Sequence, residues 1–273
     1  MNELTNLNLI KIKNKIALIC FKPNNIYLNF LNKFSNYEVY IIIDDNSVNY
    51  TARYQTKYTN LKFIQMSEKV CKQNGFINVN KIGVKKLVSG WDKALCYFAL
   101  NFNTETKTQT KVWFIEDDVF FHNEDTLLKI DSLYPEYDLL ANSDFKPATN
   151  MNEWLWPIIH IKQPGPYYCG MVCATRLSQN VLKRIREYAI VNKELFFLEA
   201  LLPTLAKAES KTKAKAESKT KELKCCCPDE LKTVVFRHEY TYEEVSINKD
   251  NIYHPVKDVL KQQEFRDKLT NLC

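Results

Sequence analysis

Hydrophobic residues in the first half of the chain follow two spacings in turn. Short, continuous apolar runs predict three buried strands, at 15–21, 38–43 and 61–66. Apolar residues that recur every three or four positions predict three helices, at 24–34, 67–75 and 89–102. Ser67 is a favourable N-cap for the second of these helices. Strands that alternate with helices indicate βαβ units and a mainly parallel sheet.

The second half of the chain is less regular. It predicts two strands, at 138–141 and 167–175, and three helices, at 124–131, 178–189 and 195–206. Asn123 and Ser178 are the expected N-caps of the first two helices. Gly170 lies inside a predicted strand, which indicates a close approach by another part of the backbone. The tryptophan- and proline-rich segment 152–160 is typical of a loop that lines a pocket.

The strongest chemical signal lies in an apolar stretch at 111–121, KVWFIEDDVFF, which places Glu116, Asp117 and Asp118 between two hydrophobic runs. An ionised carboxylate removed from water costs several kcal/mol unless it is paired, protonated or bound to a cation. Ligands of parallel sheets bind at the carboxyl ends of strands, and Mg²⁺ and Mn²⁺ prefer carboxylate oxygens. The triplet therefore predicts a site for a divalent metal or a polar ligand; helix capping or surface ion pairing is the alternative.

Two further acidic positions are candidates. Asp44 and Asp45 follow the second predicted strand, either as part of the same site or as a capped turn. Glu199 is a single acid in an apolar helical stretch. It is either a general base, whose pKa burial would raise toward neutrality, or a residue that points to solvent or pairs with Lys193 or Arg186.

Composition narrows the possible functions. The chain has 273 residues, of which 45% are hydrophobic, so a single domain with a large core is expected. The sequence KAESKTK occurs twice, at 207–213 and 215–221. Seven lysines and three glutamates lie at 207–224, so the rest of the chain holds only about +2 of the net charge of +6 and lacks a nucleic-acid-binding footprint. We expect 207–228 to be a low-complexity insertion, either disordered or an exposed helix.

Nine cysteines are present without the spacing of a zinc module, which indicates a reducing compartment. Cys20, Cys96, Cys169 and Cys173 lie in apolar contexts and are expected to be buried thiols.

No apolar run approaches the roughly 18 residues of a membrane span, and the N-terminus lacks a hydrophobic signal core. We therefore expect a cytoplasmic protein. The abundance of lysine, asparagine and isoleucine suggests an AT-rich genome, such as that of a virus or protist.

The acidic triplet resembles the metal-binding DxD element of GT-A glycosyltransferases. WDKAL at 91–95 precedes it much as in N-acetylglucosaminyltransferase I and its relatives, and HPVK at 254–257 is similar to an element of uncharacterised glycosyltransferase-like proteins. The likeness follows the order of elements over about 15–260. It implies an α/β, GT-A (Rossmann-like) fold with a mixed, mainly parallel sheet flanked by helices. The single domain, 1–273, would have a nucleotide-binding half at 15–122 and an acceptor half at 123–260.

The resemblance also implies roles for individual residues. Asp118 would ligate Mn²⁺ or Mg²⁺ together with Glu116 and His254. The residues implied to contact a UDP- or GDP-sugar donor are Asp44, Asp45, Trp91, Asp92, Lys93, Asp117 and Lys257. Glu199 lies in a segment similar to the one that carries the base in several inverting families. The implied activity is transfer of a hexosyl or N-acetylhexosaminyl group to a hydroxyl of a glycan, protein or small molecule, with inversion.

Two other functions remain open at this point. A nucleotidyltransferase shares the α/β sheet and a carboxylate-bound metal, but it normally carries a glycine-rich phosphate loop, and FKPNN at 21–25 has no glycine. A catalytically inactive glycosyltransferase-like scaffold would bind partners through the lysine-rich repeat. The absence of GxGxxG, P-loop and GxSxG motifs gives no support to dinucleotide enzymes, P-loop NTPases or α/β-hydrolases.

Overall fold

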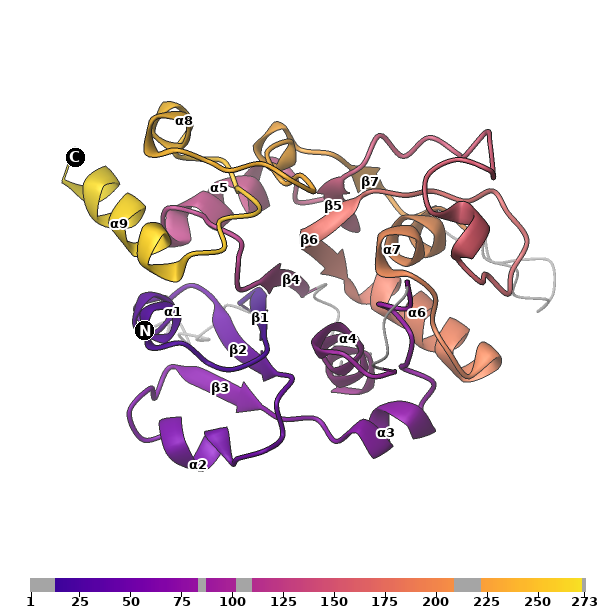
Figure 1. The fold of residues 1–273 in the computed structure, drawn as a ribbon, viewed down its shortest axis with the longest axis horizontal. Helices are drawn as coiled ribbons and strands as arrows, with labels where there is room; N and C mark the ends of the chain where they lie inside the picture. The colour runs from indigo at the N-terminus through magenta and orange to yellow at the C-terminus, as the bar shows by residue number, and fades with distance from the viewer. Residues whose placement is uncertain (1–12, 83–86, 102–109, 209–221, 272–273) are drawn as a thin grey trace, which may run out of the picture.

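A computed structural model describes residues 13–82, 87–101, 110–208 and 222–271. Within them, seven strands form one sheet in the order β3-β2-β1-β4-β6-β5-β7 (Figure 1). The strands are β1 Lys15–Cys20, β2 Glu38–Ile43, β3 Leu61–Ile64, β4 Lys111–Glu116, β5 Leu139–Asn142, β6 Met171–Ser178 and β7 Cys225–Cys226. The predicted α/β class, with a mixed and mainly parallel sheet, is confirmed.

The two halves of the sheet differ in strand direction. Strands β3, β2, β1 and β4 run parallel, as the alternation of strands and helices predicts. Strand β6 runs antiparallel to both β4 and β5, while β5 and β7 pair in parallel. The carboxyl ends of β1, β2 and β4 therefore lie along one edge, and β6 begins at that same edge.

Helices cover both faces of the sheet (Figure 1). They are α1 Asn25–Leu31, α2 Tyr50–Tyr54, α3 Glu68–Gln73, α4 Gly90–Asn101, α5 Glu124–Leu133, α6 Gln179–Asn192, α7 Leu198–Lys207, α8 Tyr242–Ile247 and α9 Val259–Thr270. Alternate strand residues face opposite sides, so Ala17 and Phe114 pack with α4, α6 and α7 in one core, whereas Leu18 and Ile115 pack with α1 and α5 in the other. A central sheet buried on both faces explains why its strands read as continuous apolar runs.

Most predicted elements are present with shifted ends. The side chains of Ser67, Asn123 and Ser178 cap α3, α5 and α6 as expected. The strand predicted at 167–175 is wrong in its bounds, because β6 starts at Met171 and extends to Ser178. Sequence reasoning missed the 12-residue helix α9 and the short elements α2, α8 and β7, together with two 3-10 turns, Trp156–Ile158 and Asp229–Leu231.

Gly170 lies where two chain segments approach closely, as predicted. A Cβ atom at this position would lie 2.5 Å from the Cβ of Ser143 and 2.9 Å from the carbonyl oxygen of Asn142. Its amide also donates to the carbonyl of Glu199 over 3.0 Å. The absence of a side chain at Gly170 thus lets α7 and the end of β5 lie against the start of β6.

The expectation of buried thiols is only half right. Cys20 and Cys96 are buried, whereas Cys169 and Cys173 are half-buried, since they lie near the open edge of the sheet. The repeat in the expected insertion falls largely outside the described residues, at 209–221. The described helices include none of the length and apolarity that a membrane span requires.

Candidate functional site

The acidic triplet lies where β4 ends. Glu116 is the last residue of β4, and Asp117 and Asp118 follow in a turn. The indole Nε1 of Trp91, in the first turn of α4, donates to Oε1 of Glu116 over 2.5 Å, and its ring stacks on Phe114. Trp91 thus fixes one oxygen of Glu116 and leaves Oε2 directed elsewhere.

A C-terminal segment brings His254 to the triplet. Phe120 and Tyr253 exchange two backbone hydrogen bonds of 2.8 Å, and the amide of Val256 donates to the carbonyl of Asp118 over 2.7 Å. In α9, the Gln262 amide group donates to the carbonyls of both Asp117 and Val256. The site therefore joins segments more than a hundred residues apart, a contact that residue spacing does not indicate and that only the resemblance of HPVK at 254–257 implied.

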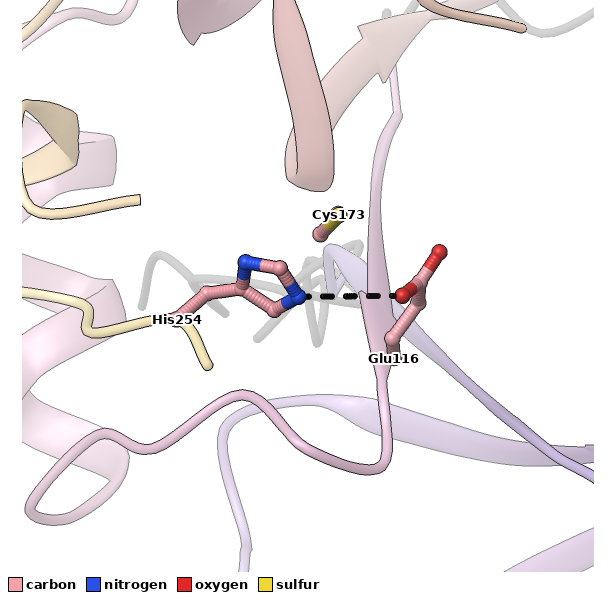
Figure 2. Close-up of side chains that lie close together, drawn as sticks. All are labelled: Glu116, Cys173 and His254. Atoms are coloured by element: carbon pink, nitrogen blue, oxygen red, sulfur yellow. Dashed lines mark ion pairs between the residues drawn. The ribbon is translucent and has the colours of Figure 1, made fainter. Parts of the chain in front are cut away.

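His254 is oriented toward the carboxylates by its other ring nitrogen. Nδ1 lies 2.7 Å from the carbonyl oxygen of Val235, which can only accept, so Nδ1 carries a proton. Nε2 lies 3.4 Å from Oδ1 of Asp118. It also lies 4.0 Å from Oε2 of Glu116, and the dashed line in Figure 2 marks this pair. In the neutral ring Nε2 is then a lone-pair donor, the arrangement of a metal-ligating histidine whose other nitrogen is fixed by a carbonyl.

The electrostatics of this cluster reflect crowded negative charge. Burial and the charge of Asp118 raise the pKa of Asp117 to about 6. Burial also raises the pKa of Glu116, with a further contribution from Asp118. Burial lowers the pKa of His254, but the hydrogen bond and charge of Asp118 outweigh this and raise it overall. Without a bound cation, protons partly compensate the carboxylates.

A small cavity of about 210 Å³ opens beside the triplet. Its lining includes Asp44, Glu116, Asp117 and Asp118 and, from the start of α4, Gly90 and Trp91. A Cβ atom on Gly90 would lie 2.9 Å from a side-chain carbon of Ile19, so glycine allows α4 to begin close to the strand ends. The cavity thus connects the ends of β2 and β4, as the sequence predicts for parallel strands.

Two residues predicted to contact the nucleotide, Lys93 and Asp44, form an ion pair with each other. The ammonium of Lys93, whose side chain is fully buried, lies 3.1 Å from Oδ1 of Asp44 and donates to the Asp44 carbonyl over 2.5 Å. Lys93 does not line the cavity and holds Asp44 at its edge. The lysine therefore acts on a ligand only through the position of Asp44.

Asp45 and Asp92 serve the local backbone. Asp45 accepts hydrogen bonds from Tyr50 Oη and from the amide and hydroxyl of Ser47. The Ser47 amide and these hydroxyls lower its pKa to about 2, which matches the alternative of a capped turn. Asp92 is buried and accepts from the amides of Val79 and Ser89 and from the Ser89 hydroxyl, although burial raises its pKa to about 6. Neither side chain lines the 210 Å³ cavity.

Lys257 lies in a different hollow. It is exposed and lines a cavity of about 570 Å³ together with Arg237 and Lys261. Only two residues separate it from His254, so the same C-terminal segment reaches both places. The structure brings Glu116, Asp118 and His254 together but does not bring Lys257 into direct contact with them.

Glu199 lies in the first turn of α7 and is half-buried. Burial raises its pKa to about 7, with a further increase from the charge of Glu116 and an opposing effect from His254. Because these charges act on it, Glu199 belongs to the same electrostatic cluster despite its distance in sequence. The carboxyl group is thus poised to exchange a proton near neutral pH.

Sequence reasoning missed the role of Cys173 in this cluster. The β4–β6 register pairs Ile115 with Ala174, and its next step sets Glu116 opposite Cys173. One donor atom from each of Glu116, Cys173 and His254 lies within 4.8 Å of the others (Figure 2). The apolar context of the cysteine gave no signal, since the contact depends on the antiparallel pairing of β6.

Comparisons with known proteins found distant likenesses among solved structures, two of which follow. The apo form of mouse xyloside xylosyltransferase 1 matches with 11% identity and a TM-score of 0.35, over 66% of this chain and 74% of that one. An active-site mutant of LgtC matches with 11% identity and a TM-score of 0.41, over 95% of each chain. At these scores neither likeness assigns an activity to this chain. No family model and no curated protein matches it.

Proposed function

We propose that the protein is a metal-dependent glycosyltransferase of GT-A type, which moves a sugar from a nucleoside-diphosphate donor to a hydroxyl acceptor. The observation that carries this proposal is the meeting of Glu116, Asp118 and His254 at the carboxyl end of β4, beside the cavity that Asp44 lines. The order of the motifs along the chain supports it independently.

The donor set fits a hard divalent cation. Oδ1 of Asp118 is buried and lies 3.4 Å from Nε2 of His254, and a negative charge there is costly unless a cation or proton compensates it. Carboxylate oxygens with one imidazole nitrogen suit Mn²⁺ or Mg²⁺. Asp118, Glu116 and His254 would hold the ion. When bound, such an ion neutralises charge on a departing diphosphate.

The chain's own residues would then prepare the donor pocket. Lys93 fixes Asp44 at the rim of the cavity, and Trp91 fixes Glu116, so both carboxylates are held before a ligand arrives. Preorganised groups of this kind need no rearrangement during the reaction. A ribose hydroxyl or a base N–H is the partner we assign to Asp44, while Lys257 would reach a phosphate only by a movement of the C-terminal segment.

Glu199 is the base in this proposal. Its pKa of about 7 allows it to accept the proton of an acceptor hydroxyl near neutral pH, as an inverting transfer requires. A cluster of aromatic rings adjoins the start of α7: Phe197, two residues before Glu199, contacts Trp154, which in turn packs on Trp156. Trp154 is 42% exposed and offers a ring face on which a sugar can stack.

Replacement of Glu199 by glutamine should lower turnover but raise the stability of the protein at pH 8. We expect turnover to fall about 10²- to 10⁴-fold, because the base is lost. The pKa of Glu199 is about 7 in the folded protein, above its ordinary value of 4.5. Between pH 4.5 and pH 7 the folded protein therefore keeps a proton on Glu199 that the unfolded chain has released. Stability from the protonated carboxyl is therefore lost as pH rises from about 4.5 to 7. Glutamine, which stays neutral, should make the protein more stable at pH 8.

Thermal unfolding in EDTA at pH 4.5 and pH 8 measures this effect. We expect a difference on the order of 1 kcal/mol in favour of Glu199→Gln at pH 8, and almost none at pH 4.5. Glu153→Gln, at an exposed position, is the matched control and should change neither stability nor turnover. An unchanged rate in Glu199→Gln would remove the base assignment.

A thermal-shift screen tests the proposed function as a whole. UDP-, GDP- and CMP-sugars are added with and without Mn²⁺, because a ligand that binds only the folded state raises the unfolding temperature. We expect one nucleotide class to stabilise the protein only when Mn²⁺ is present. Equal stabilisation by nucleoside triphosphates with release of pyrophosphate would instead indicate a nucleotidyltransferase, and no nucleotide binding would leave the scaffold hypothesis.

A further inference from the structure

Cys173 introduces a different kind of donor into the carboxylate cluster. Its Sγ lies within 4.8 Å of a carboxylate oxygen of Glu116 and of a ring nitrogen of His254, and Figure 2 shows the three side chains close together. The sulfur of Met171 lies 3.6 Å from Cys173 Sγ, so a second soft atom adjoins the cluster. The hard-ion site proposed above uses the oxygens of Asp118 and Glu116 and has no need of this thiol.

The spacing of the three donors suits a small thiophilic ion. Zinc bonds of about 2.0 to 2.3 Å hold tetrahedral donors about 3.3 to 3.8 Å apart. The donor atoms of Glu116, Cys173 and His254 all lie within 4.8 Å of one another. Inward shifts of about 1 Å would therefore bring all three within bonding distance of one zinc ion. His254 is already oriented with Nε2 toward the cluster, and its buried side chain is held by Val235.

We propose that Glu116, Cys173 and His254 bind a thiophilic divalent cation of the zinc class, with a fourth position open. The proposal shares two ligands with the hard-ion site but does not otherwise rest on the proposed function. Thiolate and imidazole donors favour Zn²⁺ over Mn²⁺ and Mg²⁺, which prefer oxygen. Binding transfers the thiol proton of Cys173 to solvent and forms a metal–sulfur bond.

One consequence is competition between two classes of ion. An ion held by Cys173 occupies Oε2 of Glu116 and Nε2 of His254, so Mn²⁺ cannot use these atoms at the same time. Zn²⁺ would therefore displace Mn²⁺ and not merely add to it. The two ligand sets share Glu116 and His254. The third ligand, Asp118 or Cys173, therefore decides which class of ion binds.

Direct metal binding tests the proposal without any nucleotide. The EDTA-treated full chain is titrated with Zn²⁺ against a chromophoric chelator, and separately with Co²⁺, whose bond to a thiolate gives a near-ultraviolet charge-transfer band. We expect Cys173→Ser to weaken Zn²⁺ binding at least tenfold and to abolish the Co²⁺ band. Cys169→Ser and Cys227→Ser are matched controls that remove other half-buried thiols and should retain both signals.

Equal Zn²⁺ affinity in wild type and Cys173→Ser, or loss of binding in Cys227→Ser instead, would overturn the proposal. Circular dichroism verifies the fold of each variant, and Cys173→Ala provides a second test if serine disturbs β6. Because no sugar nucleotide is present, failure here leaves the Mn²⁺-dependent nucleotide screen unaffected. If Zn²⁺ binds through Cys173 but no nucleotide binds in that screen, the zinc site is retained and the glycosyltransferase proposal is rejected.

Discussion

Replacement of Asp118 by asparagine should reduce Mn²⁺-dependent nucleotide binding more than any other single change at the site, and it should also reduce turnover. The amide keeps the shape of the side chain but removes one negative charge and half of the acceptor oxygens. Oδ1 of Asp118 is buried and lies 3.4 Å from Nε2 of His254. Loss of such preorganised charge typically costs about 10² to 10³ in rate.

The measurement is donor hydrolysis and nucleotide affinity with and without Mn²⁺. The fold of Asp118→Asn should persist, because the contact that fastens the C-terminal segment is made by the Asp118 backbone carbonyl and not by its side chain. Asp229→Asn, at a side chain that is 85% exposed, is the matched control and should behave as wild type. If Asp118→Asn bound the nucleotide with equal affinity in the presence and absence of Mn²⁺, and as tightly as wild type, this result would contradict the assignment of Asp118 as a metal ligand.

The parallel half of the sheet was predictable because its determinants are local. Strands buried on both faces produce continuous apolar runs, and β1 and β2 begin where the sequence places them. The caps at Ser67 and Asn123 were recognisable, since a side-chain oxygen before a helix satisfies free amides. The antiparallel direction of β6 was not predictable, because strand direction depends on connections and not on residue spacing.

The site was predictable only where a strand end fixes it. Asp44 and Glu116 share one edge because parallel strands end together. The partners of Lys93 and Asp92 could not be foreseen, since a sequence does not reveal which buried polar groups satisfy each other. Lys93 pairs with Asp44, and Asp92 with Ser89. The charged residues of WDKAL, Asp92 and Lys93, therefore hold Ser89 and Asp44 in place and do not line the cavity.

A second buried ion pair holds together the face of the sheet opposite α4. Arg176, on β6, is 1% exposed, and its Nη1 lies 2.6 Å from Oδ1 of Asp131 on α5. Its Nη2 donates to the carbonyl of Tyr134 at the end of the same helix. The Asp131 carboxylate also accepts from the hydroxyl of Tyr37 over 2.7 Å and from the indole of Trp113 over 3.1 Å. One buried carboxylate thus links β4, β6 and α5.

Arg176→Met should lower the free energy of unfolding by about 3–5 kcal/mol, because it leaves the Asp131 charge buried without its counter-ion. A loss of this size is a large part of the roughly 5–15 kcal/mol that stabilises a typical domain. The urea midpoint should fall accordingly. Adding Asp131→Asn to Arg176→Met should recover part of the loss, since the uncompensated charge is then removed.

Arg237→Met is the matched control for this change. Arg237 is exposed, so its loss should alter stability by no more than about 0.5 kcal/mol. A fall of less than 1 kcal/mol in Arg176→Met would mean that hydrogen bonds from Tyr37, Trp113 and Asn14 suffice to stabilise the Asp131 carboxylate. In that case hydrogen bonds, and not the ion pair, would fasten α5 against the strand that carries Glu116, and Asp131→Asn alone would then be the more destabilising variant.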